Sequence, residues 1–468
     1  MPRIFITGYG VVCAIGNNRK ECLDSLLAGR TGVGKMQYLN TLHRELPVGE
    51  VKMSDEEMVE KLGLDPSKPW VRTSLMGIWA LKEALEQSGI SAFRSCCHDD
   101  SSMTNSGTVQ TPDSDGKAAA YGFPLINGTT VGGMDRSERY YRHHIEDDSK
   151  NEYIKCHDCG AVSYMIAGAF DCFNMVSTPS TACSSAMNSI IRGAEMILDG
   201  EASIVAAGGS ESLSSFHTNG FNSLMILDKE LCRPFDKTRS GLNLGEGAAY
   251  FILESEESVK KRGVKPLAEL KGFANTCDAF HQTASSEDGE GAYLAMKEAL
   301  ESASIAPEQI DWIKAHGTGT PNNDASETVS IRRLFGDNHP PVSSTKAFTG
   351  HTTSASGSIE AAFGLLAIEN QFIPESLNWK ESDGDTLAPY TGKGHRKVKN
   401  VLCNAFGFGG NDSSLLLSAI DEETFDGVAF DGVSISISHD NKCTRDGKHI
   451  DTECQSYVEP SDNGRDRK

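Results

Sequence analysis

Residues 177–186 read Ser177-Thr-Pro-Ser-Thr-Ala-Cys-Ser-Ser-Ala186. Apolar residues follow at helical spacing before Gly200 gives a stop signal, namely Ile190, Ile191, Ala194, Ile197 and Leu198. This spacing predicts a buried helix that begins close to Cys183. A short apolar strand is predicted directly after it, at residues 204–207. Helices that alternate with short apolar strands are typical of α/β folds.

The same alternation continues on both sides of this segment. On the N-terminal side we predict a strand at residues 4–7 and helices at 18–28 and 71–87. After Pro266 we predict strands at 267–273 and 312–315 and helices at 291–302, 325–335 and 358–370. The sequence therefore predicts an α/β architecture with one set of elements in each half of the chain.

The composition is that of a globular protein and argues against two classes of partner. The 468 residues are enough for more than one hydrophobic core. A net charge of -21 argues against nucleic acid, because such binding rests on Lys and Arg that neutralise phosphates. No stretch approaches the roughly 18 uninterrupted apolar residues of a membrane span. The first ten residues show no basic leader or cleavage site, so we expect a cytoplasmic protein.

The 13 cysteines are irregularly spaced and odd in number, so we expect no disulfide framework. Cys156-His-Asp-Cys159 has the spacing of half a zinc site, and Cys96-Cys97-His98 is a conceivable second half. A structural zinc site needs four ligands held close together, and the second group lies in a polar segment. We therefore predict no metal.

Two segments differ in composition from the rest of the chain. Residues 95–120 are crowded with Ser, Thr, Asp and Gly, which predicts an exposed insertion loop. Residues 419–468 shift to Asp, Gly, Ser and Lys after the last apolar strand, which predicts a polar C-terminal tail.

Cys183 is the first candidate for chemistry. At a helix N-terminus the helix dipole and the free main-chain amides favour a thiolate, the form that takes an acyl group from a thioester. Small neighbours, Ala182, Ser184 and Ser185, leave room for a substrate. A buried structural cysteine is the alternative, and this segment alone does not decide between the two.

Two histidines are presented on loops farther along the chain. In Asp311-Trp-Ile-Lys-Ala-His-Gly-Thr-Gly-Thr320 a strand delivers His316 to a loop whose glycines allow a ligand to approach. In Ser343-Ser-Thr-Lys-Ala-Phe-Thr-Gly-His-Thr352, Lys346 and His351 precede a small-residue helix. Either histidine alone would more often be a hydrogen-bonded structural residue, but the two together favour a site.

Residues 401–411 read Val401-Leu-Cys-Asn-Ala-Phe-Gly-Phe-Gly-Gly-Asn411, a strand that breaks into a glycine-rich turn around Phe408. Such a turn can direct main-chain N–H groups at an oxyanion. The alternative is a simple hairpin with packed phenylalanines.

Four blocks in this order resemble the signature blocks of the β-ketoacyl-acyl-carrier-protein synthases of the synthase II type. They are Thr181-Ala-Cys-Ser-Ser185, Ala315-His-Gly-Thr-Gly-Thr320, Lys346 with Gly350-His351, and Asn404-Ala-Phe-Gly-Phe-Gly-Gly410. The resemblance extends from Met1 to about Ser418 and includes residues 233–236 and 241–254. The insertion and the tail have no counterpart in an ordinary synthase II, so the depth of an acyl pocket is left open.

The resemblance implies a thiolase-like fold, in which two similar α/β halves form a layered αβαβα sandwich. We place the halves at residues 1–256 and 257–418. It also implies a homodimer, or a heterodimer with a related subunit.

The resemblance also implies roles for individual residues. Cys183 corresponds to the nucleophile, His316 and His351 to the paired histidines, and Lys346 to their support, with Glu360 behind it. The main-chain amides of Cys183 and Phe408 would form the oxyanion hole. Positions that would line the substrate path are Thr283, Thr318, Thr320, Phe221 and Phe408. Lys68 and Arg72 are candidates for docking the carrier protein.

The implied activity is chain elongation by decarboxylative Claisen condensation. An acyl chain would move from acyl carrier protein to Cys183 and condense with malonyl carrier protein, giving carbon dioxide and a 3-oxoacyl product in fatty-acid, polyene or polyketide synthesis. No cofactor is expected, because the phosphopantetheine belongs to the carrier protein.

An elongating synthase has two alternatives. A non-catalytic chain-length subunit of a heterodimer usually lacks the nucleophilic cysteine. Thiolases and starter-unit synthases use Cys-His-Cys or Cys-His-Asn sets. Cys183 with His316, Lys346 and His351 therefore favours elongation.

Overall fold

The structure is a computed structural model of the whole chain. It describes residues 2–93 and 122–421 and, beyond them, three short strands at residues 436–437, 443–445 and 448–449. The predicted insertion at 95–120 and most of the predicted tail at 419–468 lie outside the described residues. The chain divides into two compact units, Met1–Asp426 and Gly427–Lys468. In the second unit the strands β11 (Ser436–Ile437), β12 (Cys443–Arg445) and β13 (Lys448–His449) pair antiparallel.

The first unit is built on one ten-stranded sheet made of two similar sets of five strands. The first set is β1 (Ile4–Cys13), β2 (Phe123–Gly128), β3 (Phe173–Ser177), β4 (Ile204–Glu211) and β5 (Gly247–Ser255). The second set is β6 (Ala268–Cys277), β7 (Trp312–Lys314), β8 (Val342–Ser343), β9 (Asn400–Gly407) and β10 (Asn411–Ser418). The strand order is β3-β2-β4-β5-β1-β6-β10-β9-β7-β8.

The two sets repeat one topology. In each set the three strands on the outer side are parallel, and the two strands nearest the other set are antiparallel to their neighbours. The sets join through a short antiparallel pairing of β1 with β6, at Phe5 with Glu269 and Ile6 with Ala268.

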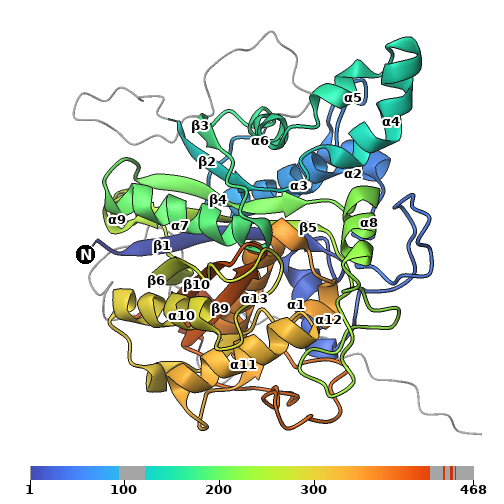
Figure 1. Cartoon of the computed structure of the whole chain (residues 1–468). Helices are drawn as coiled ribbons and strands as arrows, with labels where there is room; N and C mark the ends of the chain where they lie inside the picture. The colour runs from blue at the N-terminus through green and yellow to red at the C-terminus, as the bar shows by residue number, and fades with distance from the viewer. Residues whose placement is uncertain (1, 94–121, 422–435, 438–442, 446–447, 450–468) are drawn as a thin grey trace, which may run out of the picture. The chain divides into compact units, whose positions relative to one another are not determined.

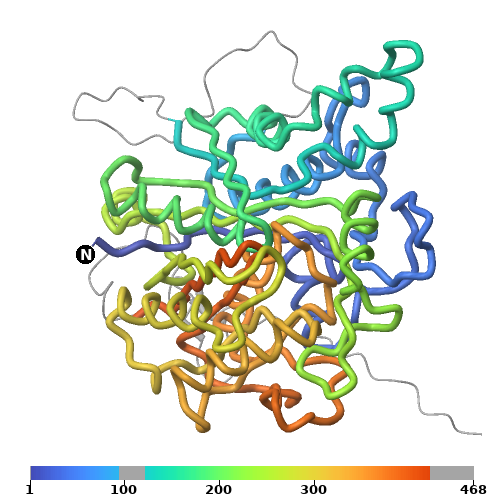
Figure 2. Tube along the Cα trace, viewed as in Figure 1, coloured from blue at the N-terminus to red at the C-terminus, as the bar shows by residue number. Residues whose placement is uncertain are grey.

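Helices cover both faces of each set and so form the layers. Helices α3 (Arg72–Gln87) and α6 (Cys159–Ala167) pack on the outer face of the first set, and α10 (Glu290–Ala303) and α11 (Pro321–Phe335) lie outside the second. Between the sets lie α7 (Ser185–Leu198) and α13 (Ser356–Asn370), which contact each other and strands of both sets. Figure 1 shows α3 on one side of the two sets and α10 and α11 on the other, and the trace in Figure 2 follows the same course. The predicted thiolase-like αβαβα sandwich is confirmed.

The remaining helices connect or flank these layers. They are α1 (Arg19–Ala28), α2 (Asp55–Leu62), α4 (Met134–Asp147), α5 (Asn151–Lys155), α8 (Ser215–Ser223), α9 (Glu256–Arg262) and α12 (Lys346–Thr349), with 3-10 turns η1 (Ala182–Ser184), η2 (Pro307–Gln309) and η3 (Thr353–Ala355).

The central helices explain where the functional residues lie. Residues 356–368 of α13 are all buried, as expected for a helix that is covered on every side. A Cβ atom on Gly357 would lie 2.8 Å from the Cβ of Met187, so glycine allows α13 to approach α7 closely. The turns η1 and η3, which precede these helices, are consequently in contact.

Four predicted elements extend at least four residues beyond their predicted bounds, and two of them are the strands predicted at 204–207 and 267–273, which continue to Glu211 and Cys277. The strand predicted at 4–7 continues to Cys13, because Gly8 and Gly10 let β1 lie directly against α3, where a Cβ on Gly8 would meet the carbonyl oxygen of Ala84 at 2.2 Å. The helix predicted at 325–335 begins earlier, at Pro321, since proline has the right φ angle for a first helical position.

Candidate active site

Cys183 lies in the 3-10 turn that opens α7, as the sequence predicts. The residue before it, Ala182, has a left-handed φ of 51°, which turns the chain sharply from β3 into the helix. A positive φ on a residue with a Cβ costs free energy and is usual where a functional side chain must be presented. The thiol is 5% exposed.

The second half of the chain has a similar turn with a positive φ before its own central helix. The turn η3 precedes α13, and its first residue, Thr353, has a φ of 45°. His351 lies two residues before this turn, and its main-chain N–H donates to the carbonyl of Asn243 at 2.7 Å. Because η1 and η3 are in contact, the imidazole Nε2 of His351 comes to 3.1 Å from the Sγ of Cys183.

A buried carboxylate holds the main chain at His316 in place. Glu327 accepts hydrogen bonds from the main-chain N–H of His316 at 2.8 Å and of Gly317 at 2.7 Å. The imidazoles of His316 and His351 meet edge to face, with ring centroids 5.3 Å apart. The structure therefore brings Cys183 and both predicted histidines together.

Lys346 fixes the tautomer of His316. Its Nζ lies 3.4 Å from the Nδ1 of His316 and donates to the Oε1 of Glu360 at 2.7 Å. An ammonium group has no lone pair, so Nδ1 must be the acceptor and the neutral ring carries its proton on Nε2. The Nδ1 of His351, in contrast, has no hydrogen-bond partner among the described residues, so its tautomer is not fixed in this way.

Both histidines are neutral at pH 7. Burial lowers the pKa of His316 and of His351 well below the usual value, and the nearby charges of Lys346 and Lys314 lower each pKa further. Neutral imidazoles can donate a hydrogen bond through one ring nitrogen and accept one through the other.

The thiol of Cys183 differs from the prediction. Burial raises its pKa to about 11, although Lys346 and a hydrogen bond from the main-chain N–H of Phe408 lower it in part. Burial therefore outweighs the helix N-terminus, and the resting group is a thiol. Its proton must leave during the reaction, and the Nε2 of His351 is placed to accept it.

We expect Cys183 to be alkylated by iodoacetamide more slowly than Cys277 at pH 7.5, because Cys183 is buried with a raised pKa whereas Cys277 is exposed. The difference between the two rates should narrow only as the pH rises toward 11, where the Cys183 thiol ionises. Peptide mapping after timed quenching gives both rates in one sample. Faster labelling of Cys183 at pH 7.5 would mean that a thiolate is present at rest.

The turn around Phe408 directs a main-chain N–H at the same sulfur. Phe408 follows β9, and Gly409 and Gly410 have φ of 85° and 78°, which glycine alone adopts without strain. The strand β9 contacts η1, and the N–H of Phe408 donates to the thiol of Cys183. The geometry is that of a donor placed next to the reacting atom.

The predicted path residues gather on one side of this turn. Phe221, on α8, stacks on Phe408 with ring centroids 5.8 Å apart, and both rings are only half-buried. The hydroxyls of Thr318 and Thr320 lie 2.8 Å apart. Thr283 is exposed, on a loop whose neighbouring Gln282 carbonyl accepts from the N–H of Gly409 at 2.8 Å.

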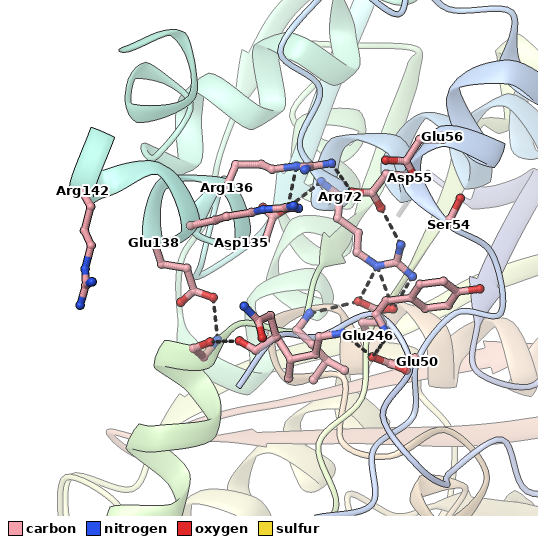
Figure 3. Close-up of a pocket in the computed structure, with 16 residues that line it drawn as sticks. Glu50, Ser54, Asp55, Glu56, Arg72, Asp135, Arg136, Glu138, Arg142 and Glu246 are labelled. Carbon is pink, nitrogen blue, oxygen red and sulfur yellow. Dashed lines mark hydrogen bonds and ion pairs between the residues drawn. The ribbon is translucent and has the colours of Figure 1, made fainter. Parts of the chain in front are cut away.

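The prediction that Arg72 docks a carrier protein is wrong, because its side chain is buried. It is 8% exposed and pairs with Glu246 at 2.7 Å and with Asp55 at 2.6 Å. Figure 3 shows these two carboxylates around its guanidinium, at a cavity of about 500 Å³ that contains none of Cys183, His316, His351 and Lys346. Lys68, the other docking candidate, is exposed.

Sequence reasoning missed three buried charged residues around the site. Lys314 forms an ion pair with Glu360, Glu327 holds the His316 loop, and Glu211 accepts from the hydroxyls of Thr129 and Thr353. The available signal is a charged residue at the end of a short buried strand, since Lys314 is the last residue of β7 and Glu211 the last residue of β4.

Neither a metal site nor a spanning helix is seen in the part of the chain that the structure describes. No three His, Cys, Asp or Glu side chains within residues 2–93 and 122–421 gather as metal ligands would. The Cys156 thiol donates to the carbonyl of Glu152. Within the same ranges no helix is both long and apolar enough to cross a membrane.

Comparisons with known proteins show the family to which the chain belongs. The profile "Beta-ketoacyl synthase, N-terminal domain" matches residues 1–258, and "Beta-ketoacyl synthase, C-terminal domain" matches residues 267–380. The 3-oxoacyl-[acyl-carrier-protein] synthase 2 of Vibrio cholerae is 31% identical over 433 residues, which are 88% of this chain and 98% of that protein.

Two solved structures share the fold. The ishigamide ketosynthase/chain length factor structure contains a chain with 28% identity and a TM-score of 0.79, over 90% of this chain and all of the other. The ketosynthase ApeO with its chain length factor ApeC, from Xenorhabdus doucetiae, gives 27% identity and a TM-score of 0.74, over 90% and 98% of the two chains. The chain described here belongs to the β-ketoacyl synthase family and is an acyltransferase of the condensing type.

Proposed function

We propose that this protein is an elongating 3-oxoacyl-[acyl-carrier-protein] synthase, in which Cys183 carries the growing acyl chain. The observation that carries the proposal is the 3.1 Å contact between the Cys183 Sγ and the His351 Nε2, beside a His316 whose proton Lys346 fixes on Nε2. A nucleophile, a proton acceptor and a fixed donor thus meet at one point.

In the first half-reaction the sulfur of Cys183 attacks the thioester carbonyl of acyl carrier protein. His351 accepts the thiol proton, and the main-chain N–H groups of Cys183 and Phe408 stabilise the oxyanion. The carrier-protein sulfur leaves and takes the proton from His351. Because burial keeps the pKa of His351 low, the imidazolium does not retain that proton.

In the second half-reaction malonyl carrier protein enters the site. The bond to its carboxylate carbon breaks, carbon dioxide leaves, and the electron pair becomes an enolate. The Nε2–H of His316 donates to the enolate oxygen, and His351 donates when its neutral ring carries the proton on Nε2. The carbanion then attacks the acyl carbonyl, and the Cys183 sulfur leaves as a thiolate that takes one proton from water, the proton consumed by the overall reaction. Preorganised donors of this kind act on charge that exists only along the reaction path.

This chemistry requires no metal or redox cofactor, because the thioesters arrive activated and loss of carbon dioxide drives the condensation. The proposed partner is an acyl carrier protein, whose pantetheine arm would run past Thr318, Thr320 and Thr283. A homodimer is the proposed assembly. We place the reaction in the cytoplasm, since the cysteines within residues 2–93 and 122–421 are free thiols and Cys183 must stay reduced.

The proposal is tested by mixing the purified protein with acyl carrier proteins that bear chains of different length and saturation. Intact mass should show one acyl group per chain, and peptide mapping should place it on Cys183. Addition of malonyl carrier protein should then give a 3-oxoacyl product of the preferred length. If no chain loads unless a related ketosynthase subunit is added, the protein is instead a chain-length partner, as in the heterodimers among its structural neighbours.

Substitutions at two neighbouring basic residues, Lys68 and Arg72, should affect different quantities, the first carrier-protein docking and the second protein stability. We expect Lys68→Glu to raise KM for acyl carrier protein about threefold to tenfold with an unchanged Tm, because an exposed charge acts mainly on encounter. Arg72→Lys should do the reverse, with KM unchanged and a loss of about 1–3 kcal/mol in the free energy of unfolding, since lysine cannot reproduce the paired hydrogen bonds of guanidinium. A KM effect from Arg72→Lys alone would contradict this assignment.

A further inference from the structure

A second lysine shares the carboxylate that supports the site. Glu360 contacts the Nζ of Lys346 through Oε1 at 2.7 Å and the Nζ of Lys314 through Oε2. The side chains of both lysines are 0% exposed and that of Glu360 is 2% exposed. Lys314 projects from β7, two residues before His316, whereas Lys346 comes from α12 and Glu360 from α13.

One lysine would be enough to balance Glu360 and to reach His316. A second buried ammonium costs free energy, because it leaves water without a carboxylate of its own. The three groups together carry two positive charges and one negative charge, so the cluster has one positive charge in excess. This excess lies beside the imidazole that Lys346 contacts.

Among the groups that face Lys314, Glu360 is the carboxylate that forms an ion pair with it. These groups are Glu360 on α13, Lys346 on α12, Cys403 on β9, Glu327 on α11, and the two imidazoles of His316 and His351. Cys403 is a neutral thiol, since burial raises its pKa to about 12. Glu327 is a second carboxylate, but its two oxygens accept the main-chain N–H groups of His316 and Gly317, so it is directed at that loop.

We propose that Lys314 is a positioning residue which, by taking one oxygen of Glu360, leaves an uncompensated positive charge beside His316 that favours anionic states of the reacting groups. The inference rests on the proposed function, in which the Cys183 thiolate and the malonyl enolate are those anions. Lys314 contacts neither the substrate nor the reacting atoms. It acts through Glu360 and Lys346.

The pH dependence of this effect follows from the charge of Lys314. Burial lowers the pKa of Lys314 to about 8, with Glu360 opposing that shift. Below pH 8 the lysine is charged and the excess positive charge is present. Above pH 8 the lysine loses its proton and the excess disappears. A difference between the wild type and a variant with a neutral residue at position 314 should therefore exist at pH 6–7.5 and vanish above pH 9.

The test is the pH profile of Cys183 alkylation by iodoacetamide, read by peptide mapping, because it needs no acyl carrier protein. Lys314→Met and Lys314→Gln remove the charge, and Lys314→Gln keeps a hydrogen-bonding group. The double variant Lys314→Met with Glu360→Gln retains only Lys346 and so restores one excess positive charge. Lys271→Met, on β6 of the same sheet, is the control for removal of a lysine.

We expect Lys314→Met and Lys314→Gln to slow alkylation of Cys183 at pH 7 by about threefold to tenfold, since less thiolate forms without the charge. The double variant should return toward the wild-type rate, and all rates should converge above pH 9. Melting curves for each variant confirm folding, and if one single variant does not fold, the other gives the comparison.

Two results would overturn the inference. One is a double variant slower than either single variant, which is the result expected of a packing role. The other is a difference that persists unchanged above pH 9. Neither result bears on whether the wild type loads an acyl chain, so failure of this inference and failure of the proposed function are distinguishable.

Discussion

Cys183→Ala should abolish acyl loading and lower the rate of condensation at least about a thousandfold, because the covalent intermediate has no other acceptor in the site. The His351 Nε2 that lies 3.1 Å from the sulfur would keep its place but would have no thiol proton to accept. Alanine is smaller than cysteine and is compatible with the surrounding turn, so the loss should be one of chemistry and not of folding. Intact mass and product formation measure the two half-reactions separately.

The matched control is Cys277→Ala, which removes an exposed thiol at the end of β6 and leaves Cys183 and the two histidines in place. It should load acyl chains as the wild type does. Mass gain in Cys183→Ala equal to that of the wild type would place the acyl group elsewhere, and peptide mapping would then identify the true acceptor. Acyl loading that is retained in Cys277→Ala, as in the wild type, but lost in Cys183→Ala establishes Cys183 as the nucleophile.

Glu360→Gln should lower the free energy of unfolding by about 3–5 kcal/mol at pH 7, because it leaves two buried ammonium groups with no carboxylate. The substitution keeps the size of the side chain, so the loss reports charge and not a cavity. Condensation should also fall, since Lys346 would no longer be held against the Nδ1 of His316. Urea unfolding followed by circular dichroism gives the stability change.

The penalty should depend on pH in a definite direction. Lys314 has a depressed pKa in the folded protein, about 8 against 10.5 unfolded, so its contribution to stability is present above pH 10.5 and is lost as the pH falls through 8. Without Glu360 its folded pKa falls further, so the Glu360→Gln penalty should shrink as the pH rises from 7 toward 10.

Glu301→Gln is the control for this prediction, because it breaks an exposed pair with Lys297 and should cost at most about 1 kcal/mol. The variant with Lys314→Met added to Glu360→Gln should be more stable than Glu360→Gln alone, since only one unpaired ammonium remains. If the free energy of unfolding of Glu360→Gln lies within about 1 kcal/mol of the wild-type value, the cluster holds less charge than its geometry indicates.

The sequence by itself determined which residues meet and in what kind of fold. The helix after Cys183 is readable because apolar residues recur at helical spacing up to Gly200, and the glycines after His316 and around Phe408 mark loops that present side chains. These signals are local, since each depends on residues within one helical turn or one strand of each other. Residues far apart in the chain were joined only through the resemblance of four ordered blocks to one family.

Tertiary structure alone decided the electrostatics. Arg72 and Lys68 look alike in sequence, yet packing buries the first between Glu246 and Asp55 and exposes the second. The Cys183 thiol is protonated because burial, which no local pattern measures, outweighs the helix N-terminus. Lys314 enters the site only because folding brings its side chain on β7 to Glu360 on α13. Charge energies depend on desolvation and on distances between elements that the chain brings together last, and for that reason they cannot be read from sequence spacing.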